Sequence, residues 1–232
     1  MTANATQGDT WRTAEALYRD LVELAIKAPQ NKELLEAQIH GATHLISLYV
    51  RAKELAKAQS LFDEITESIS KNPESPGFRQ MKAGVAVPLS AAYGNAGFID
   101  KVRDIYDDVK KMAERFPEEA ELREHQVDIA ANLAIDYIDK EQIADAVRLY
   151  QEISTIATER PTEVEIQRER ARVAVLLIFH YTESNQLKEA RQLYPVLSQL
   201  TSAHPEVAFF QRAQADAAVS IIAKIDEMEA EA

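Results

Sequence analysis

The chain has 232 residues, of which 46% are hydrophobic and 28% charged, a balance typical of a folded globular protein rather than a disordered one. Its formal net charge of -12 disfavours contact with phosphate backbones and anionic membranes, so neither nucleic acid nor a membrane is expected as a partner. The sequence contains no cysteine, which excludes disulfides, thiolate metal sites and cysteine nucleophiles.

The N-terminal residues lack hydrophobic periodicity, and we expect residues 1–9 to form a disordered segment. They carry neither a basic start nor an apolar run, so no signal peptide is expected and a cytoplasmic location is the default prediction. No uncharged apolar stretch approaches the roughly 18 residues that a membrane-spanning helix needs. A single domain is predicted for residues 10–230.

Tyrosines and prolines recur through this domain at a spacing of 44 residues. The two series are Tyr49, Tyr93, Tyr137 and Tyr181, and Pro29, Pro73, Pro117, Pro161 and Pro205. A fixed period indicates a repeat protein in which each unit packs on its neighbours, so the chain is interpreted as one array rather than as separate globular domains.

The first helix of the array is predicted to start near Trp11, after Asp9 and Thr10 as candidate N-caps. Its apolar residues recur at intervals of three and four, which is typical of a helix with one buried stripe. The stripe consists of Trp11, Ala14, Leu17, Tyr18, Leu21, Leu24 and Ala25, and its next copy of Leu55, Ala58, Leu61, Phe62, Ile65 and Ile69. Later copies fall in residues 99–109, 143–153 and 187–197. We name this helix B.

Each helix B ends before a proline, and a second helix, helix A, is predicted to open at that proline. Proline suits the start of a helix, and the acidic residues that often follow it favour the positive end of the helix dipole. Every helix A carries an alanine at one place, where a small side chain lets two helices approach closely: Ala42, Ala86, Ala130, Ala174 and Ala218. Short polar turns join A to B and predict antiparallel pairs. The array therefore comprises a half repeat, four full repeats and a half repeat.

These residues resemble the tetratricopeptide repeat (TPR) family, in which a tyrosine late in helix A is followed by a small residue, an aromatic residue and a closing proline. The matching sets are Tyr49, Ala58 and Phe62, then Tyr137, Ala146 and Tyr150, then Tyr181, Ala190 and Tyr194. The period exceeds the 34 residues of that family, which longer helices would explain. The resemblance implies an all-α fold, a right-handed α-α superhelix of about ten antiparallel helices, with a protein or peptide bound in the concave groove along the A helices.

Catalytic and metal-binding patterns find little support. His40 and His44 are spaced so that two imidazoles on one helix could share a metal, but the sequence offers no HExxH pattern and no cysteine to complete a site. Gly-rich phosphate loops and nucleophile elbows are also missing from the sequence. We therefore expect no catalytic residue, no metal and no cofactor, and predict that the protein is not an enzyme.

The inward-facing positions of the TPR family, counted from each tyrosine, select candidate groove residues. They are His40, Thr43, His44 and Ser47, then Gly84, Val87, Pro88 and Ala91, then Asp128, Ala131, Asn132, Ile135 and Ile138, then Arg172, Val175, Leu176 and Phe179. The predicted partner-binding residues are Asn132, Ile135, Ile138, Arg172, Val175, Leu176 and Phe179, on which an apolar helix or extended peptide would lie. The alternative is that these apolar residues pack against adjacent A helices as core.

The two half repeats suggest a second mode of binding. Phe209 takes a slot that holds Glu33, Gly77, Glu121 or Glu165 in the other copies, which adds an apolar residue to the last helix. One chain's C-terminal half repeat could then complete another's N-terminal half repeat in a head-to-tail contact. The alternative is that Trp11 and Phe209 form ordinary caps.

The function predicted from these features is a non-catalytic scaffold or adaptor that binds a neutral or basic protein or peptide. The alternative is a peptide-sensing regulatory domain that changes its superhelical shape when a ligand binds.

The tyrosine slot allows a test of the repeat phasing. Tyr137→Ala should lower the free energy of unfolding by about 3 to 5 kcal/mol if the ring is interhelical core, because truncation leaves a cavity. Urea unfolding followed by circular dichroism measures the loss. A loss well below about 1 kcal/mol would mean that the phasing is wrong.

Overall fold

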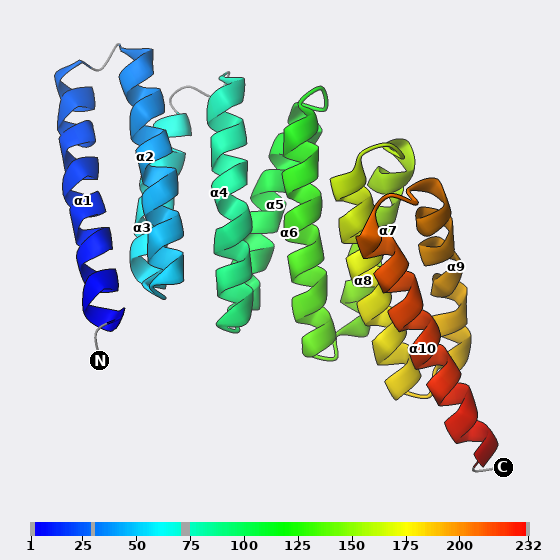
Figure 1. Cartoon of the computed structure of the whole chain (residues 1–232). Coiled ribbons are helices and arrows are strands. Elements are labelled where there is room, and N and C mark those ends of the chain that lie inside the picture. Colours follow the sequence, from blue (N-terminus) through cyan, green and yellow to red (C-terminus); the bar gives the residue numbers. More distant parts are fainter. Residues whose placement is uncertain (1–2, 29–30, 71–74, 231–232) are drawn as a thin grey trace. The chain divides into compact units, whose positions relative to one another are not determined.

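The computed structural model describes residues 3–28, 31–70 and 75–230, and the regular structure in these ranges is entirely helical (Figure 1). The ten helices are α1 (Ala3–Lys27), α2 (Lys32–Arg51), α3 (Leu55–Ser70), α4 (Pro76–Asn95), α5 (Ile99–Arg115), α6 (Ala120–Asp139), α7 (Ile143–Glu159), α8 (Val164–Glu183), α9 (Leu187–Ala203) and α10 (Ala208–Ala230). The even-numbered helices correspond to the predicted helices A, and the odd-numbered ones to helices B. The all-α fold class is confirmed.

The chain forms two compact units, Met1–Ile129 and Ala130–Ala232, and the boundary falls inside α6. In the first unit each helix from α1 to α5 packs on the next, and α2 also packs on α4. In the second unit α8 packs on α7, α9 and α10, and α9 packs on α10. Contacts between sequence neighbours, together with contacts between successive A helices, are the packing pattern of a helical repeat solenoid. None of the described helices is both long and apolar enough to cross a bilayer.

The turn from each helix A to the next helix B contains one residue in the left-handed region. These residues are Lys53 (φ 61°), Gly97 (φ 81°), Glu141 (φ 59°) and Asn185 (φ 58°). The amide of the following residue donates to the carbonyl of the preceding tyrosine, at 2.9 Å for Tyr49, 2.9 Å for Tyr93, 2.8 Å for Tyr137 and 2.7 Å for Tyr181. The amide of the left-handed residue donates three positions back. Each turn is therefore a Schellman motif, which satisfies the last carbonyls of helix A and reverses the chain within a few residues.

The turn from helix B to helix A is built on the proline. The residue before it, Phe116, Arg160 or His204, has φ between -126° and -132° and ψ near 60° because the proline ring disfavours helical geometry there. An amide two positions after the proline closes the turn on the carbonyl of that preceding residue, at 3.0 to 3.2 Å. Proline thus occupies the second position of a β-turn, which its fixed φ suits.

Three predicted helix starts are wrong for this reason. The helices α6, α8 and α10 begin three residues after their prolines rather than at them, since the turn comes first. The helix α4 begins at Pro76, and its predicted start at Pro73 lies outside the described residues, as does Pro29.

The predicted boundary at the N-terminus also differs from the structure. Helix α1 begins at Ala3, within the segment 1–9 that was expected to be disordered, and Met1 and Thr2 lie outside the described residues. Helical hydrogen bonding needs no apolar periodicity, so the lack of an apolar stripe in these residues did not mark the end of the helix.

The apolar stripe predicted for the rest of α1 is only partly buried, because Leu17 is 62% exposed and Leu24 48% exposed. The counterparts of Leu17 in two later helices B, Leu61 and Leu149, are buried.

The core follows the predicted slots. Tyr49, Tyr93 and Tyr137 are buried, and so are the alanines Ala42, Ala86, Ala130 and Ala174, whereas Tyr181 is half-buried. The hydroxyl of Tyr49 donates to Glu15 on α1 at 2.5 Å, and that of Tyr93 donates to Gln59 on α3 at 2.5 Å. Burial raises the pKa of both tyrosines, so each hydroxyl keeps its proton and acts as a hydrogen-bond donor between helices.

The left-handed residues give a stability prediction. Glu141 carries a Cβ in a conformation that costs about 1 kcal/mol relative to glycine, and its side chain is exposed. Glu141→Gly should therefore raise the free energy of unfolding by up to about 1 kcal/mol, while Glu141→Ala, which keeps the Cβ, should not. Urea unfolding of the two variants beside the unchanged protein measures the difference. Equal stability of the two variants would contradict the assigned turn.

Candidate partner-binding site

The seven predicted partner-binding residues lie on two helices of the second unit, α6 and α8. We call them the A-helix face: Asn132, Ile135, Ile138, Arg172, Val175, Leu176 and Phe179. All seven are partly exposed. Residues that alternate with them on the same helices, such as Leu133, Val173 and Leu177, are buried. Helices α6 and α8 therefore separate a packed side from a partly exposed side, and the seven residues lie on the exposed side.

A hydrogen bond joins the two helices across this face. The Arg172 guanidinium donates from Nη2 to Oδ1 of Asn132 at 2.9 Å, and it forms an ion pair with Glu169 at 2.5 Å. The structure thus brings the two polar members of the predicted set together. Because Arg172 is held by two protein groups, it anchors α8 to α6, and binding an anionic partner group would have to displace one of these contacts.

The apolar part of the face extends further than the sequence interpretation placed it. Ile135 and Ile138 lie on α6, and Val175, Leu176 and Phe179 on α8. On α10, which packs against α8, Val219 occupies the repeat position of Val175 and is 66% exposed. Val219 lies 44 residues after Val175, so applying the same spacing once more would have predicted it.

Asp136 is a polar residue of this region that the sequence interpretation missed. It follows Asn132 by four positions, so helical geometry places both on one side of α6. Its Oδ2 atom is buried and has no hydrogen-bond partner. Burial, with a smaller contribution from the negative charge of Asp139, raises the pKa of Asp136 to about 6. The Asp136 side chain as a whole is partly exposed, so a cation can approach its outer part and pair with the carboxylate.

The groove positions predicted in the first unit have other surroundings. His40 and His44 are exposed, with ring centroids 5.8 Å apart, and among the described residues no group of three or more His, Cys, Asp or Glu side chains could hold a metal. The hydroxyls of Thr43 and Ser47 donate to carbonyls one turn earlier on their own helix, at 2.8 and 3.1 Å. These polar side chains are satisfied locally.

Ala131 and Phe209 were also singled out from the sequence, and neither belongs to the A-helix face. Ala131 was assigned to the groove but is fully buried, because a residue next to Asn132 on a helix points toward a different side. Phe209 is half-buried, and its ring lies 6.0 Å from that of Phe210 and 5.9 Å from the Arg168 guanidinium. These contacts agree with a ring that caps the end of the core as well as with one that binds a second copy.

Comparison with known proteins supports the fold. A PPR repeat, a TPR-like helical repeat, matches residues 42–68, which contain the end of α2 and most of α3. The crystal structure of BtubC (BKLC) from P. vanneervenii is similar over 97% of this chain and 93% of that chain, with a TM-score of 0.52 and 18% identity. That likeness concerns the fold alone. No match was found among curated proteins. Because PPR repeats bind protein or RNA, the match does not support the expected exclusion of nucleic acid.

The raised pKa of Asp136 gives a prediction for stability. The folded protein binds a proton at Asp136 more tightly than the unfolded chain. Stability is therefore lost as pH rises from about 4, the ordinary pKa of aspartate, through about 6, and the loss is complete above that. Asp136→Asn should therefore raise the free energy of unfolding at pH 7 by about 1 kcal/mol, after allowance for partial solvent screening. The gain should shrink as pH falls from about 6 toward the ordinary pKa of aspartate, about 4.

Urea unfolding at several pH values measures this gain, with Asp226→Asn on the exposed side of α10 as the control. A gain that is the same at all pH values, or that also occurs in the control, would contradict the account.

Proposed function

We propose that the protein is a non-catalytic scaffold or adaptor that binds an apolar segment of another protein on the A-helix face. One observation carries the proposal: a row of partly exposed apolar side chains on α6 and α8 lies beside a partly exposed carboxylate, Asp136. Partly exposed apolar side chains gain free energy when a partner covers them, at roughly 25 cal/mol for each Å² removed from water. The charged group then orients the partner rather than supplying most of the affinity.

The chemistry of the face indicates what the partner segment contains. Ile135, Val175 and Phe179 favour an aliphatic or aromatic strip, either on one side of a helix or on alternate residues of an extended peptide. Asp136 favours a lysine or arginine beside that strip. The net charge of -12 acts in the same direction, because it attracts a neutral or basic partner over an acidic one. A cytoplasmic location is part of this proposal.

The repeat length is also part of the proposal. Four Schellman turns with left-handed residues at 53, 97, 141 and 185 support a structural unit of 44 residues, since the same backbone conformation returns at that interval. Each unit would then contribute one equivalent strip of helix A to the binding surface.

RNA binding is a second candidate function, and the PPR repeat match favours it. The A-helix face itself favours a protein partner. Its one arginine, Arg172, is engaged by Asn132 and Glu169, and Asp136 would repel a phosphate. A peptide-sensing regulator is the third candidate, and a change of molecular dimensions in small-angle scattering when a peptide binds would favour it.

The proposal is tested by affinity capture from a native lysate with the unchanged protein and with the double variant Val175→Glu, Phe179→Glu. We expect a partner that the unchanged protein captures and the double variant loses by about tenfold or more, because two buried charges would face the partner's apolar strip. Circular dichroism and thermal unfolding must first show that the variant is folded. Nuclease treatment of the lysate separates a protein partner from an RNA one.

The matched control is Gln151→Glu, Thr155→Glu, at two exposed positions of α7 in the same unit. It adds the same charge away from the A-helix face and from both terminal helices. Retention of the partner by both double variants would overturn the assignment to the A-helix face.

Head-to-tail self-association through the two ends is the second interaction that we propose. Exposed apolar side chains on both terminal helices support it, including Ile26 at 71% on α1 and Ile222 at 64% on α10. Sedimentation velocity should show a mass that rises with protein concentration and a weaker rise for Leu17→Glu, Ile26→Glu. A monomer mass that does not change with concentration would contradict self-association.

A further inference from the structure

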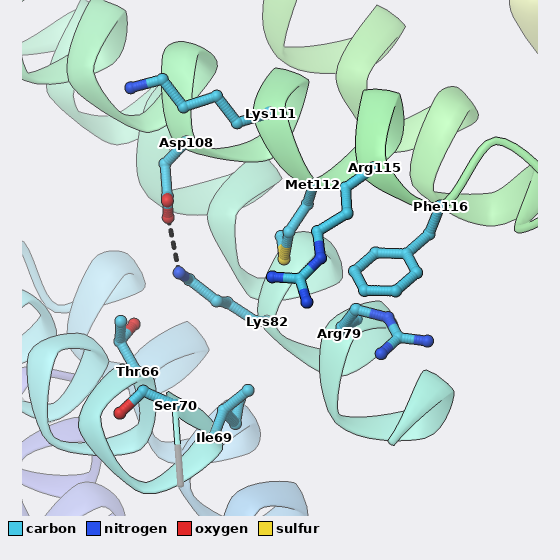
Figure 2. Close-up of a pocket in the computed structure, with 10 residues that line it drawn as sticks. All are labelled: Thr66, Ile69, Ser70, Arg79, Lys82, Asp108, Lys111, Met112, Arg115 and Phe116. Carbon is cyan, nitrogen blue, oxygen red and sulfur yellow. Dashed lines mark ion pairs between the residues drawn. The ribbon is translucent and has the colours of Figure 1, made fainter. Parts of the chain in front are cut away.

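A pocket of about 230 Å³ lies in the first unit among α3, α4 and α5 (Figure 2). Helix α4 contributes Arg79 and Lys82, and one face of α5 contributes Asp108, Lys111 and Arg115. Among the described lining residues there are thus four cationic side chains and a single carboxylate. In a chain with a net charge of -12, this is a local reversal of charge that calls for a physical explanation.

The inner cations are held in place by the protein. Lys82 is 7% exposed and its ammonium lies 2.5 Å from the carboxylate of Asp108, which is itself half-exposed. Arg79 is 5% exposed, forms an ion pair with buried Glu119, and has its guanidinium 3.6 Å from the centre of the Phe116 ring. Both side chains are therefore fixed before any ligand arrives, which lowers the entropy cost of binding.

The outer cations belong to the rim. Lys111 and Arg115 are exposed and lie four residues apart on α5, so they extend from the same side of the helix. Figure 2 shows them on the α5 side of the pocket, with Lys82 between α5 and the α3 side chains. These two positive charges at the mouth of the pocket attract an anion. They do not stabilise each other, because like charges repel.

The remaining lining supplies a hydroxyl and an apolar wall. The Oγ1 atom of Thr66 on α3 is buried and has no hydrogen-bond partner, although a buried hydroxyl is normally satisfied. Ile69, Met112 and Phe116 form the apolar part of the wall. A ligand with an acceptor oxygen and an apolar body would satisfy both features at once.

We propose that this pocket binds one terminal oxyanion, a phosphate monoester or a carboxylate, carried on an apolar group such as an aromatic ring. Lys111 and Arg115 attract the anion to the mouth of the pocket. Lys82 keeps its ion pair with Asp108 and donates to the anion from another of its three N–H groups, and the Thr66 hydroxyl donates to one of the anion's oxygens. The apolar body packs against Met112 and Ile69. This site lies outside the A-helix face, and it does not depend on the function proposed above.

The methionines provide a direct probe of this site. The chain has four, and only Met112 lines the pocket among the described residues, while Met228 lies on α10 in the second unit. Protein labelled with ¹³C at the methionine methyl groups is titrated with phenyl phosphate, with phenylacetate and with neutral benzyl alcohol. Met112→Leu assigns the Met112 signal. We expect the Met112 signal to shift and saturate with at least one of the two anions at millimolar concentration, while the Met228 signal stays in place.

Two charge-reversal variants complete the test. Lys111→Glu, Arg115→Glu should weaken anion binding by about tenfold or more, because two attractive charges become repulsive. Lys188→Glu, Arg191→Glu changes the net charge equally at exposed positions of α9 and should bind as the unchanged protein does. Added salt should also weaken binding, since rim charges are screened.

The outcomes separate the sources of the oxyanion. Binding of phenyl phosphate alone supports the proposal with a phosphorylated ligand, binding of phenylacetate alone supports it with an acidic one, and binding of both supports a general oxyanion site. The proposal is overturned if neither anion gives a saturable shift of Met112. Equal binding of benzyl alcohol, or full binding by Lys111→Glu, Arg115→Glu, would also overturn it.

Discussion

The structure depends on how tightly each helix A is closed at its C-terminal end. A Schellman motif ends the four A helices α2, α4, α6 and α8, and the carbonyl that it satisfies belongs to the tyrosine of the 44-residue series. The same tyrosine buries its ring in the core, fully in three copies and partly at Tyr181. One residue position therefore sets both the packing of helix A and the point at which the chain reverses. Moving the tyrosine by one residue would misplace the turn and the ring together.

Because these turns are short, the two sides of each helix A have different surroundings. One side packs on its partner helix and on the neighbouring A helices, where alanines such as Ala130 and Ala174 allow close approach. The other side cannot be covered by a helix from the same repeat, because the connection is too short to place one there. In the second unit this uncovered side carries isoleucine, valine, leucine and phenylalanine beside two charged residues, Arg172 and Asp136. Apolar side chains kept at such positions are the physical basis for assigning a binding role to the A-helix face.

The helices and most of the core could be predicted because the same pattern of apolar residues recurs along the sequence, although each single copy of it is a weak indication. A single tyrosine such as Tyr137 would have meant little, but four at equal spacing located the slot.

Features set by local backbone geometry were harder to predict. Proline fits both a helix start and a β-turn, so the sequence alone misplaced the starts of α6, α8 and α10. The state of Asp136 depends on burial from several directions, and the pocket beside Lys82 depends on side chains brought together from three helices. Neither has a spacing that a sequence could show.

The most direct test of the central claim, that the A-helix face is the partner-binding surface, is site-specific photocrosslinking. A photoreactive phenylalanine analogue placed at Phe179 should form a crosslink in native lysate, and sequencing of the attached peptide should find an apolar segment with a lysine or arginine beside it. The same analogue at Arg148, an exposed position on α7 in the same unit, should form no such crosslink. Crosslinking to the same peptide from both positions, or from Arg148 alone, would contradict the account.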